Sequence, residues 1–398
     1  MSQKDVITLN VTVFFVTIKH VLELYTIQGG IMRKFVVTLL LLVFAVVLVG
    51  CNADPNADEK IVLITDKGDI TDKSFNQGAY EGVKAYAEAN KINYGYLKPA
   101  DATDADYIDA IEQAITDGAT VIVTPGYLFE PAVNAVQKDY PEVKFIILDG
   151  SPKNATDGTL ESNVYSVFYA EEQSGFLAGY AAVKDGYRRL GFMGGMAVPA
   201  VQRFGHGFVQ GAAVAAAELG LADNAVSIQY LYTGDFKATP EVRAAAATMY
   251  AADVEVIFAC GGSVGQSVMA AAATAGKKVI GVDVDQSGDS NTVITSAMKN
   301  LSGSVEQALE AIFETDKWAT EFGGKSVTLD ATREGVQLPM ATSKFTTFNQ
   351  AAYDQAYAKL VNGTYAVSNV IGQFGDDGTA SKQFETAKVR VTVILFEG

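Results

Sequence analysis

A regular alternation of short apolar runs and helical segments constrains the fold of this chain most. Residues 60–65 form an apolar run typical of a strand that is buried on both faces, and residues 76–90 follow with the apolar spacing of a helix. Further strand-like runs at 94–97, 120–124 and 144–149 are separated by helical segments. Helices between short β-branched runs predict parallel βαβ units, and therefore an α/β fold.

The alternation is repeated in the second half of the chain. Strands are expected at 163–167, 189–193, 227–232, 254–258, 278–282 and 389–396, and helices at 170–183, 201–219, 240–251, 264–275, 302–314 and 350–360. The chain has 398 residues, which corresponds to two or three domains at roughly 100–200 residues each, and 49% of them are hydrophobic, enough for a large core. The pattern therefore predicts two doubly wound parallel-sheet lobes.

Polar and glycine-rich segments follow the predicted strands in both halves. They occupy residues 66–69, 125–127, 149–150, 194–195, 234–236, 261–263 and 283–286. In open parallel sheets, ligands bind beyond the carboxyl ends of the strands. Two such halves facing each other therefore predict a binding cleft.

Three carboxylates in these segments are candidate ligand contacts, because Asp66, Asp149 and Asp283 each end a predicted strand. A carboxylate in that position accepts hydroxyl hydrogens from a sugar, as acidic residues do for ribose in nucleotide-binding folds. Capping of the following helix is the competing role for each of them.

Two aromatic residues, Phe75 and Phe236, stand in polar loops beside Gly and Asp. An apolar ring there either packs on a flat ligand or anchors its own loop. Gly261 belongs to a Gly-Gly-Ser turn that is either a tight strand-to-helix connection or a place where the backbone approaches a ligand. Lys299 follows a predicted strand at 294–298 and either donates to a ligand or pairs with Asp283.

Several other kinds of function are disfavoured by the composition. The formal net charge of -16 argues against a nucleic-acid-binding face, because nothing would neutralise phosphates. With two Cys and two His residues, neither a zinc or iron–sulfur site nor a disulfide framework is expected, and no cofactor is predicted. We expect Cys260 to pack as a small hydrophobic residue. His206 is the one His that follows the predicted leader, so any Ser-His-Asp triad would need it. No Walker motif is present either, and we therefore expect no enzyme.

The segment that ends at Cys51 resembles a bacterial lipoprotein signal. A basic start at 32–34 precedes an apolar stretch at 35–50, which is too short for a comfortable membrane span and closes on Leu-Val-Gly-Cys. The resemblance implies a lipid on Cys51 and cleavage before it. Residues 1–50 are then a leader whose true start is expected at Met32, and residues 51–59 are a lipidated linker. The protein is expected at the cell membrane, facing the extracytoplasmic side.

Further along, residues 69–78 resemble the ligand loop of the basic membrane lipoprotein family, which includes purine-nucleoside receptors. The other stretches that resemble this family are 140–149, 171–179, 194–199 continuing to Phe204, Gly207 and Phe208, and 281–286. Together they extend the similarity over roughly residues 60–396.

The family resemblance implies a type I periplasmic-binding-protein-like fold with three hinge crossovers. The first lobe is expected to contain residues 60–165 plus about 295–350, and the second lobe residues 166–294 plus about 351–398. The family also implies a monomer that captures a nucleoside and delivers it to an ABC permease.

The resemblance also assigns roles to individual residues. Phe75 and Phe236 would sandwich the base, although the loop 232–236 lacks the Trp expected at its start. The base edges would be read by Asp66, Ser74 and Asn76, and the ribose would be held by Asp149, Asp283 and Lys299. Alternative functions remain a sugar or other small-solute receptor of the same fold, and a surface adhesin or signalling lipoprotein.

Overall fold

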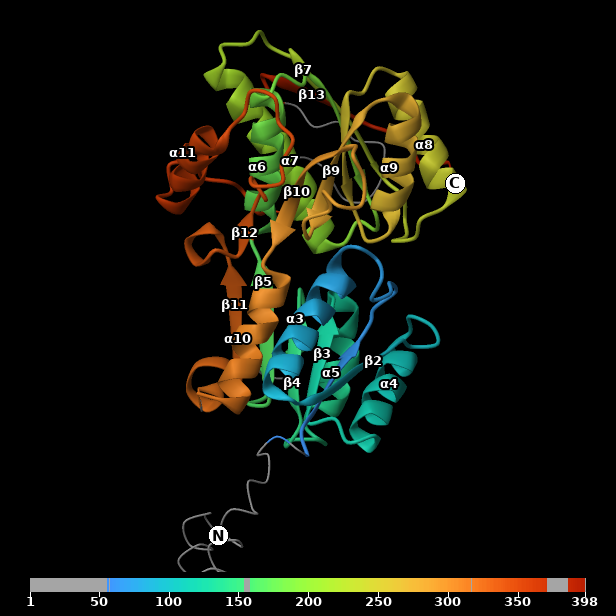
Figure 1. Ribbon diagram of the computed structural model, residues 1–398, viewed down its shortest axis with the longest axis vertical. Coiled ribbons are helices and arrows are strands. Elements are labelled where there is room, and N and C mark those ends of the chain that lie inside the picture. The colour runs from blue at the N-terminus through green and yellow to red at the C-terminus, as the bar shows by residue number, and fades with distance from the viewer. Residues whose placement is uncertain (1–55, 57, 154–157, 316, 371–385, 398) are drawn as a thin grey trace, which may run out of the picture. The chain divides into compact units, whose positions relative to one another are not determined.

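The structure is a computed structural model that describes residues 56, 58–153, 158–315, 317–370 and 386–397 (Figure 1). The chain divides into two compact units, Met1–Ala57 and Asp58–Gly398, and only the second is described below. The predicted leader, the start at Met32 and the lipidation at Cys51 lie outside the described residues. No helix in the described ranges has the length and apolar character needed to cross a membrane.

Six strands of the described chain form the first sheet, in the order β11-β5-β4-β3-β1-β2. They are β1 (Lys60–Ile64), β2 (Asn93–Leu97), β3 (Val121–Pro125), β4 (Lys144–Leu148), β5 (Val164–Tyr169) and β11 (Lys325–Leu329). All neighbouring strands pair in parallel. Because β1 lies between β2 and β3, the chain winds in both directions from it, and a topological switch point falls between β1 and β3.

The second sheet repeats this topology in the order β12-β10-β9-β8-β6-β7-β13, with β12 at the edge that β11 takes in the first sheet and one extra strand, β13, at the opposite edge. Its strands are β6 (Arg189–Gly194), β7 (Val226–Tyr232), β8 (Val256–Cys260), β9 (Lys278–Asp283), β10 (Val293–Lys299), β12 (Val336–Gln337) and β13 (Val389–Val393). Only β12 runs antiparallel to its neighbour within the described strands. The switch point of this sheet lies between β6 and β8.

Helices cover both faces of each sheet. They are α3 (Phe75–Asn90), α4 (Asp104–Thr116), α5 (Glu130–Val136), α6 (Glu171–Lys184), α7 (Pro199–Glu218), α8 (Pro240–Ala251), α9 (Val264–Ala275), α10 (Leu301–Phe313) and α11 (Gln350–Val361), with short turns η1 (Tyr127–Phe129), η2 (Trp318–Phe322) and η3 (Ala331–Arg333). In β1, Ile61 belongs to the same apolar cluster as α3, while Val62 belongs to the cluster of α4 and α5. This alternation explains why the strand reads as a continuous apolar run.

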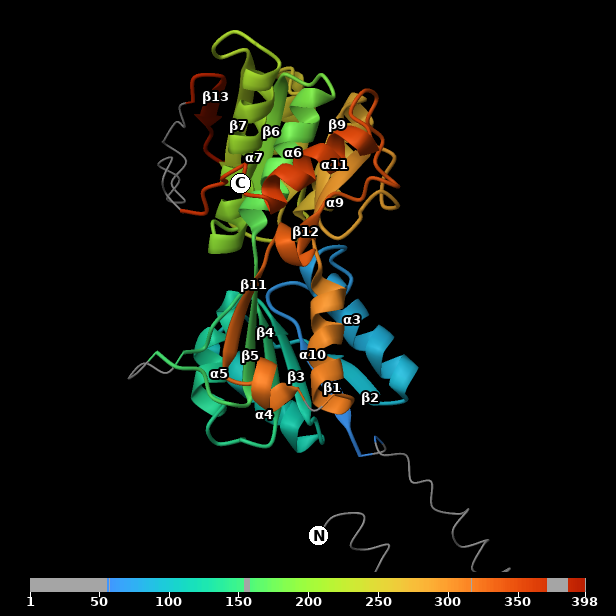
Figure 2. The same cartoon turned by 90° about the vertical axis from the view of Figure 1, so that its left-hand side faces the viewer.

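The chain crosses between the two sheets three times. It leaves β5 of the first sheet for α6, which packs against α7 and β10 of the second lobe. It returns from β10 to α10, which packs beside α3 (Figure 2). The third crossing leads from β11 to β12. Backbone hydrogen bonds join the crossings, from Ala170 N to Leu329 O and from Asn300 N to Gly335 O, both at 3.0 Å.

These crossings do not coincide with the boundaries expected from the sequence. Residues 166–169, expected in the second lobe, are part of β5 in the first sheet. Residues 295–299 and the strand β12, expected in the first lobe, belong to the second sheet. The expected boundaries at 165/166 and 294/295 cut through β5 and β10, whereas the chain crosses only after each of these strands ends. The third crossing, between β11 and β12, comes before the expected boundary near residue 350.

The helices α6 and α7 pack unusually closely. This packing brings Glu171 of α6 and Arg203 of α7 together. A Cβ atom added to Gly175 of α6 would lie 2.1 Å from the carbonyl oxygen of Phe204 in α7, and one added to Gly179 would lie 2.1 Å from that of Phe208. Since no side chain fits between these backbones, α7 lies directly against α6 at these positions.

Candidate functional site

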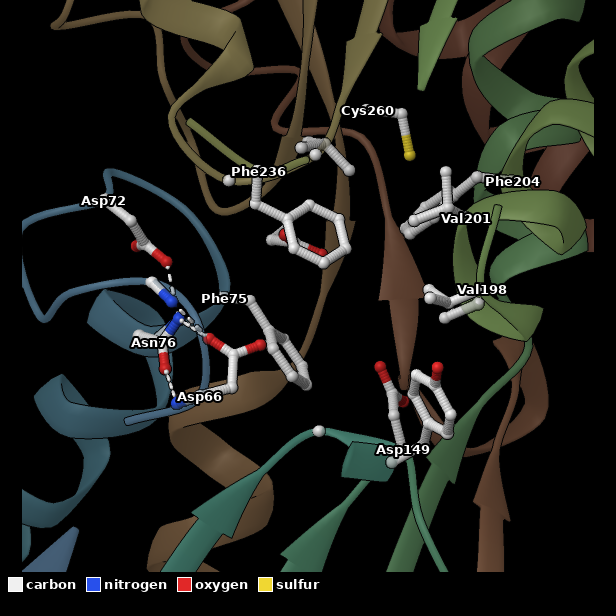
Figure 3. A pocket seen from close by; sticks show the side chains of 18 of the residues that line it. Asp66, Asp72, Phe75, Asn76, Asp149, Val198, Val201, Phe204, Phe236 and Cys260 are labelled. Carbon is white, nitrogen blue, oxygen red and sulfur yellow. Dashed lines mark hydrogen bonds between the residues drawn. The ribbon is translucent and has the colours of Figure 1, made fainter. Parts of the chain in front are cut away.

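One pocket lies between the carboxyl ends of strands from both sheets, next to both switch points (Figure 3). Its empty volume is about 740 Å³, including the space at its open mouth. Eight of the nine residues expected to contact a ligand line it: Asp66, Phe75, Asn76, Asp149, Phe236, Gly261, Asp283 and Lys299. The ninth, Ser74, does not. A cavity of this size with few polar groups is typical of a small-molecule site.

At one side of the pocket, three side chains form what we call the capping group: Asp66, Asp72 and Asn76. The Asn76 amide nitrogen donates to Asp66 Oδ1 at 2.8 Å and to Asp72 Oδ2 at 2.9 Å, and its oxygen accepts from the Asp66 backbone at 3.1 Å. Both amide hydrogens of Asn76 are therefore used within the loop. Asn76 stabilises the loop and has no amide hydrogen left to donate to a base.

Asp66 keeps one oxygen open toward the pocket. Its Oδ1 accepts from Asn76 and from the Gly68 backbone, whereas no hydrogen bond within the described residues engages Oδ2. Figure 3 shows this second oxygen on the side of the Phe75 ring. Burial raises the pKa of Asp66 above its usual value, although the bonds from Gly68 and Asn76 oppose the rise.

Asp72 was not among the predicted contacts, and its main role is at the start of α3. It accepts from the backbone nitrogens of Ser74, Asn76 and Gln77 at 2.8, 3.0 and 3.1 Å. Burial raises its pKa to about 6 against these bonds. An Asp just before a helical pattern is a recognisable capping signal, so the sequence could have assigned this role.

Ser74 joins the two lobes instead of facing the pocket. Its hydroxyl is buried and donates to Asp283 Oδ2 at 2.5 Å, across 209 positions of sequence. Gln286 Nε2 donates to the carbonyl of Lys73 beside it at 2.6 Å. The first contact uses one oxygen of Asp283, which was expected to hold the ribose together with Asp149 and Lys299.

On the other side of the pocket, five charged side chains with little exposure form what we call the charge cluster: Asp149, Glu171, Arg203, Asp283 and Lys299. The ammonium of Lys299 donates to Asp149 Oδ2 at 2.6 Å. It lies 3.4 Å from Glu171 Oε1 and 3.7 Å from Asp283 Oδ1. The expected pairing of Lys299 with Asp283 is therefore secondary to the pairing with Asp149.

The pKa values of the cluster follow from burial and proximity. Burial raises the pKa of Asp149 to about 7, in spite of Lys299, and also raises that of Asp283. Burial works to lower the pKa of Lys299, but the surrounding carboxylates outweigh it and raise that pKa. For Glu171, Arg203 and Lys299 together outweigh burial and lower the pKa.

Both aspartates of the cluster have a strained backbone. Asp149 has a φ of 56° and Asp283 a φ of 66°, in the left-handed region that favours glycine. Each follows or ends a strand of a different sheet, β4 or β9, and each turns the chain sharply there. Strained residues of this kind gather at functional sites, where the surrounding structure holds them.

The rest of the lining is largely apolar. Phe75 comes from the start of α3 and Phe236 from the loop after β7, and both rings face the pocket (Figure 3). The Lys299 ammonium lies 4.5 Å from the centre of the Phe75 ring, within the range of a cation–π contact. Gly126 and Tyr127 belong to a segment that the sequence placed at the cleft, whereas sequence reasoning assigned no ligand role to the lining residues Leu128, Val198, Pro199, Ala200, Val201 and Phe204.

The two residues considered for other chemistry lie in unremarkable positions. His206 is buried in α7 and is not among the residues that line the pocket. Cys260 is a free, buried cysteine at the end of β8 that lines the pocket, and burial raises the pKa of its thiol well above the usual value. Such a thiol is a weak nucleophile. Among the described residues, no group of three or more His, Cys, Asp or Glu side chains could hold a metal ion.

Similarity to solved structures confirms the predicted fold. A solute-binding protein of an ABC transporter system from Aeropyrum pernix K1 superposes with a TM-score of 0.65 at 20% identity, covering 78% of this chain and 93% of that one. A solute-binding protein from Conexibacter woesei gives a TM-score of 0.61 at 21% identity, covering 78% and 98%. The chain thus has the two-lobed α/β fold of type I solute-binding proteins.

Sequence similarity identifies the family. The chain is 28% identical over 366 residues to the "ABC transporter nucleoside-binding protein BmpA" of Lactococcus lactis, covering 84% of this chain and 98% of that protein. It is 28% identical over 332 residues to "Basic membrane protein A1" of Borrelia garinii, covering 81% and 93%. The model of the Bmp family matches residues 59–371. The chain therefore belongs to the Bmp family of PnrA-like ABC transporter substrate-binding proteins, as its ligand-loop motif indicated.

Proposed function

We propose that the protein is a lipid-anchored receptor that captures a purine nucleoside for an ABC importer. The observation that carries this proposal is the shared pocket, in which two aromatic rings, strand-end carboxylates and a lysine meet. A nucleoside has the matching chemistry, because it joins a flat base to a sugar with hydroxyl donors. The name of the Lactococcus lactis relative supports the same substrate class.

The aromatic rings account for binding of the base. Phe75 and Phe236 line the pocket from different lobes, so a flat ring between them would contact both. Stacking of a base on an aromatic side chain is worth roughly 1–3 kcal/mol and tolerates different bases. The open oxygen of Asp66 would accept a hydrogen from the edge of the base.

The charge cluster accounts for binding of the sugar. Asp149 Oδ1 is buried and has no hydrogen-bond partner among the described residues, while Oδ2 is held by Lys299. A buried carboxylate oxygen without a donor is unfavourable, and a ribose hydroxyl would supply that donor. Asp283 lines the same pocket and would accept from a second hydroxyl.

Capture would close the two lobes around the ligand. The contacts from Lys299 to Asp149 and from Ser74 to Asp283 each join one lobe to the other. A ligand that touches both lobes stabilises the arrangement in which they meet, and the three crossings are the natural hinge. In this proposal, the permease accepts the closed, loaded form, and the lipid on Cys51 keeps the receptor at the membrane.

A melting-temperature screen tests the ligand proposal. The soluble body, starting after Cys51, is heated with nucleosides, free bases and pentoses at equal concentration. A receptor gains about 2.7 kcal/mol of stability when free ligand reaches 100 times its Kd, so a nucleoside should raise the Tm by several degrees. A rise with pentoses alone would favour the sugar receptor, and no rise with any compound would favour an adhesin or signalling protein. Chromatography of the incubated inosine for hypoxanthine checks for hydrolysis.

A separate experiment tests the anchor. The full-length precursor and its Cys51→Ser variant are expressed in a bacterium that is fed a radiolabelled fatty acid. The unaltered chain should carry label and sediment with membranes, whereas Cys51→Ser should do neither. Equal labelling of both chains would refute lipidation at Cys51.

A further inference from the structure

An ion pair between a fully buried carboxylate and a half-buried arginine lies directly behind the polar wall of the pocket. Glu171 is fully buried at the start of α6, and its Oε2 accepts from Arg203 Nε of α7 at 2.6 Å. Its other oxygen, Oε1, lies 3.4 Å from Lys299 Nζ and has no hydrogen bond among the described residues. Neither Glu171 nor Arg203 lines the pocket, so they act on a ligand through the lining residues beside them, Lys299 and Asp149.

The pair lies where the chain crosses between lobes. Glu171 directly follows the crossing at Ala170, and Lys299 directly precedes the crossing at Asn300. The hydroxyl of Ser174, one turn along α6, donates to the carbonyl of Met298 at 3.1 Å and holds the helix to β10. The contact between Glu171 and Lys299 therefore connects two crossings on the side of the second lobe.

We propose that Glu171, held by Arg203, is a positioning residue that fixes the Lys299 ammonium at the hinge so that Asp149 keeps one oxygen open toward the ligand. The inference rests on the proposed nucleoside function. It means that residues outside the pocket set the position of the Lys299 ammonium inside it. Lys299 has three hydrogens and three carboxylates around it, at 2.6, 3.4 and 3.7 Å. Without Glu171, the ammonium is drawn toward Asp149 and Asp283 and competes with ligand hydroxyls for their oxygens.

The charges around Asp149 determine how its titration should change in each variant. The groups that influence Asp149 are Lys299 of β10, Glu171 of α6, Arg203 of α7 and Tyr169 of β5, and Asp283 of β9 lies 3.7 Å from the same Lys299 ammonium. After burial, the largest influences on the pKa of Asp149 are Lys299, which lowers it, and Glu171, which raises it, while Arg203 also lowers it. Neutralising Glu171 should move the titration of Asp149 to lower pH, and neutralising Arg203 should move it to higher pH.

Two measurements on the same variants test the proposal. The titration of the Asp149 carboxyl is followed by carbon NMR in the ligand-free soluble body, with Asp149→Asn to assign the signal. Inosine affinity is then measured by calorimetry from about pH 5.5 to about pH 8. Glu171→Gln should weaken inosine binding about tenfold at the upper pH and lower the titration midpoint. Arg203→Gln, a second variant in case the first does not fold, should raise the midpoint.

The neighbouring Glu172→Gln is the matched control. Glu172 is buried in the same helical turn, but it has no ion pair with Lys299 and is not among the main influences on Asp149. It should leave the midpoint and the inosine affinity unchanged.

Three outcomes decide between a positioning role and a structural one. An unchanged midpoint in folded Glu171→Gln overturns the proposal, and so do equal losses of affinity in Glu171→Gln and Glu172→Gln. If the unaltered protein binds no nucleoside, the proposed function fails, and the ligand-free titration still decides whether Glu171 controls the Lys299–Asp149 contact.

Discussion

The capping group and the charge cluster carry carboxylates on two sides of one pocket, but they are built in opposite ways. Asp66 and Asn76 of the capping group are ten positions apart and bond to each other and to their own loop. In the charge cluster, Lys299 and Asp149 are 150 positions apart and come from different sheets. In the proposed closure, the first group would therefore keep its geometry when the lobes separate, whereas the second would be completed only when they meet.

The largest expected effect comes from removing the cation of the charge cluster. Lys299→Met leaves three buried carboxylates facing one another, and breaking a buried pair in this way costs roughly 3–5 kcal/mol. We expect nucleoside affinity to fall by about 100-fold or more and the Tm to drop. Lys98→Met is the control, because Lys98 pairs with Asp69 at 2.9 Å on the exposed surface. Comparable losses of affinity and Tm in Lys299→Met and Lys98→Met would show that the charge cluster contributes no more to binding and stability than a surface ion pair.

The next effect concerns the apolar wall that separates the two polar groups. Phe75→Ala should weaken nucleoside binding by roughly 1–3 kcal/mol through the loss of one base–aromatic stack. Tyr96→Ala removes an aromatic ring that is 43% exposed and is not among the lining residues, and it should leave binding unchanged. Calorimetric titration of both variants compares them. Unaltered affinity in Phe75→Ala would refute the stacking role.

A third prediction distinguishes the sugar side from the base side. Asp283→Ala should reduce affinity for adenosine more than affinity for adenine, by roughly 1.5–3 kcal/mol, because only the nucleoside carries hydroxyls for the charge cluster. Asp66→Ala, in the capping group, should affect the two compounds similarly. Competition binding with both ligands measures the ratio. Equal losses for adenosine and adenine in Asp283→Ala would contradict a ribose contact.

The smallest effect is a dependence of ligand-free stability on pH. Burial raises the pKa of Asp149 and Glu172 to about 7 and that of Asp72 to about 6. A carboxyl with a raised pKa binds protons more readily in the folded chain, so stability rises as the pH falls from about 7 toward the unfolded pKa near 4. Between about pH 7.5 and about pH 5.5 we expect a Tm increase on the order of 2 °C, smaller in Asp149→Asn.

Nucleoside binding should show the opposite trend over the same range. Protonation of Asp149 removes an acceptor from the charge cluster, so affinity should fall while ligand-free stability rises. If the ligand-free Tm stays constant or falls toward acid pH, the raised pKa values of these carboxyls do not determine how stability depends on pH.

Much of the fold could be predicted because buried parallel strands leave an unmistakable apolar pattern. The predicted runs at 60–65, 120–124 and 144–149 coincide with strands to within a residue or two. β11 escaped notice because its residues are mostly exposed and show no apolar run. β12 is only two residues long, too short for any periodicity.

The site residues that could be predicted are those at the carboxyl ends of buried strands, because these ends lie together at one edge of each sheet. Asp149 and Asp283 were found because a carboxylate after a buried strand must lie at the ligand-binding edge of its sheet. Glu171 and Arg203 were missed because both lie on helices, where a charged residue is ordinarily exposed. Ser74 was assigned to the ligand because sequence spacing does not reveal that Asp283 of the other lobe lies within hydrogen-bonding distance.

The last strand has a practical consequence for anyone who shortens or tags this chain. β13 pairs in parallel with β7 from Val389 to Val393 and forms the outer margin of the second sheet. A truncation before residue 389 would uncover the unpaired amides and carbonyls of β7, a surface on which other chains can add strands and aggregate. Expression designs should therefore keep the native tail through Val393 and place any affinity handle beyond it.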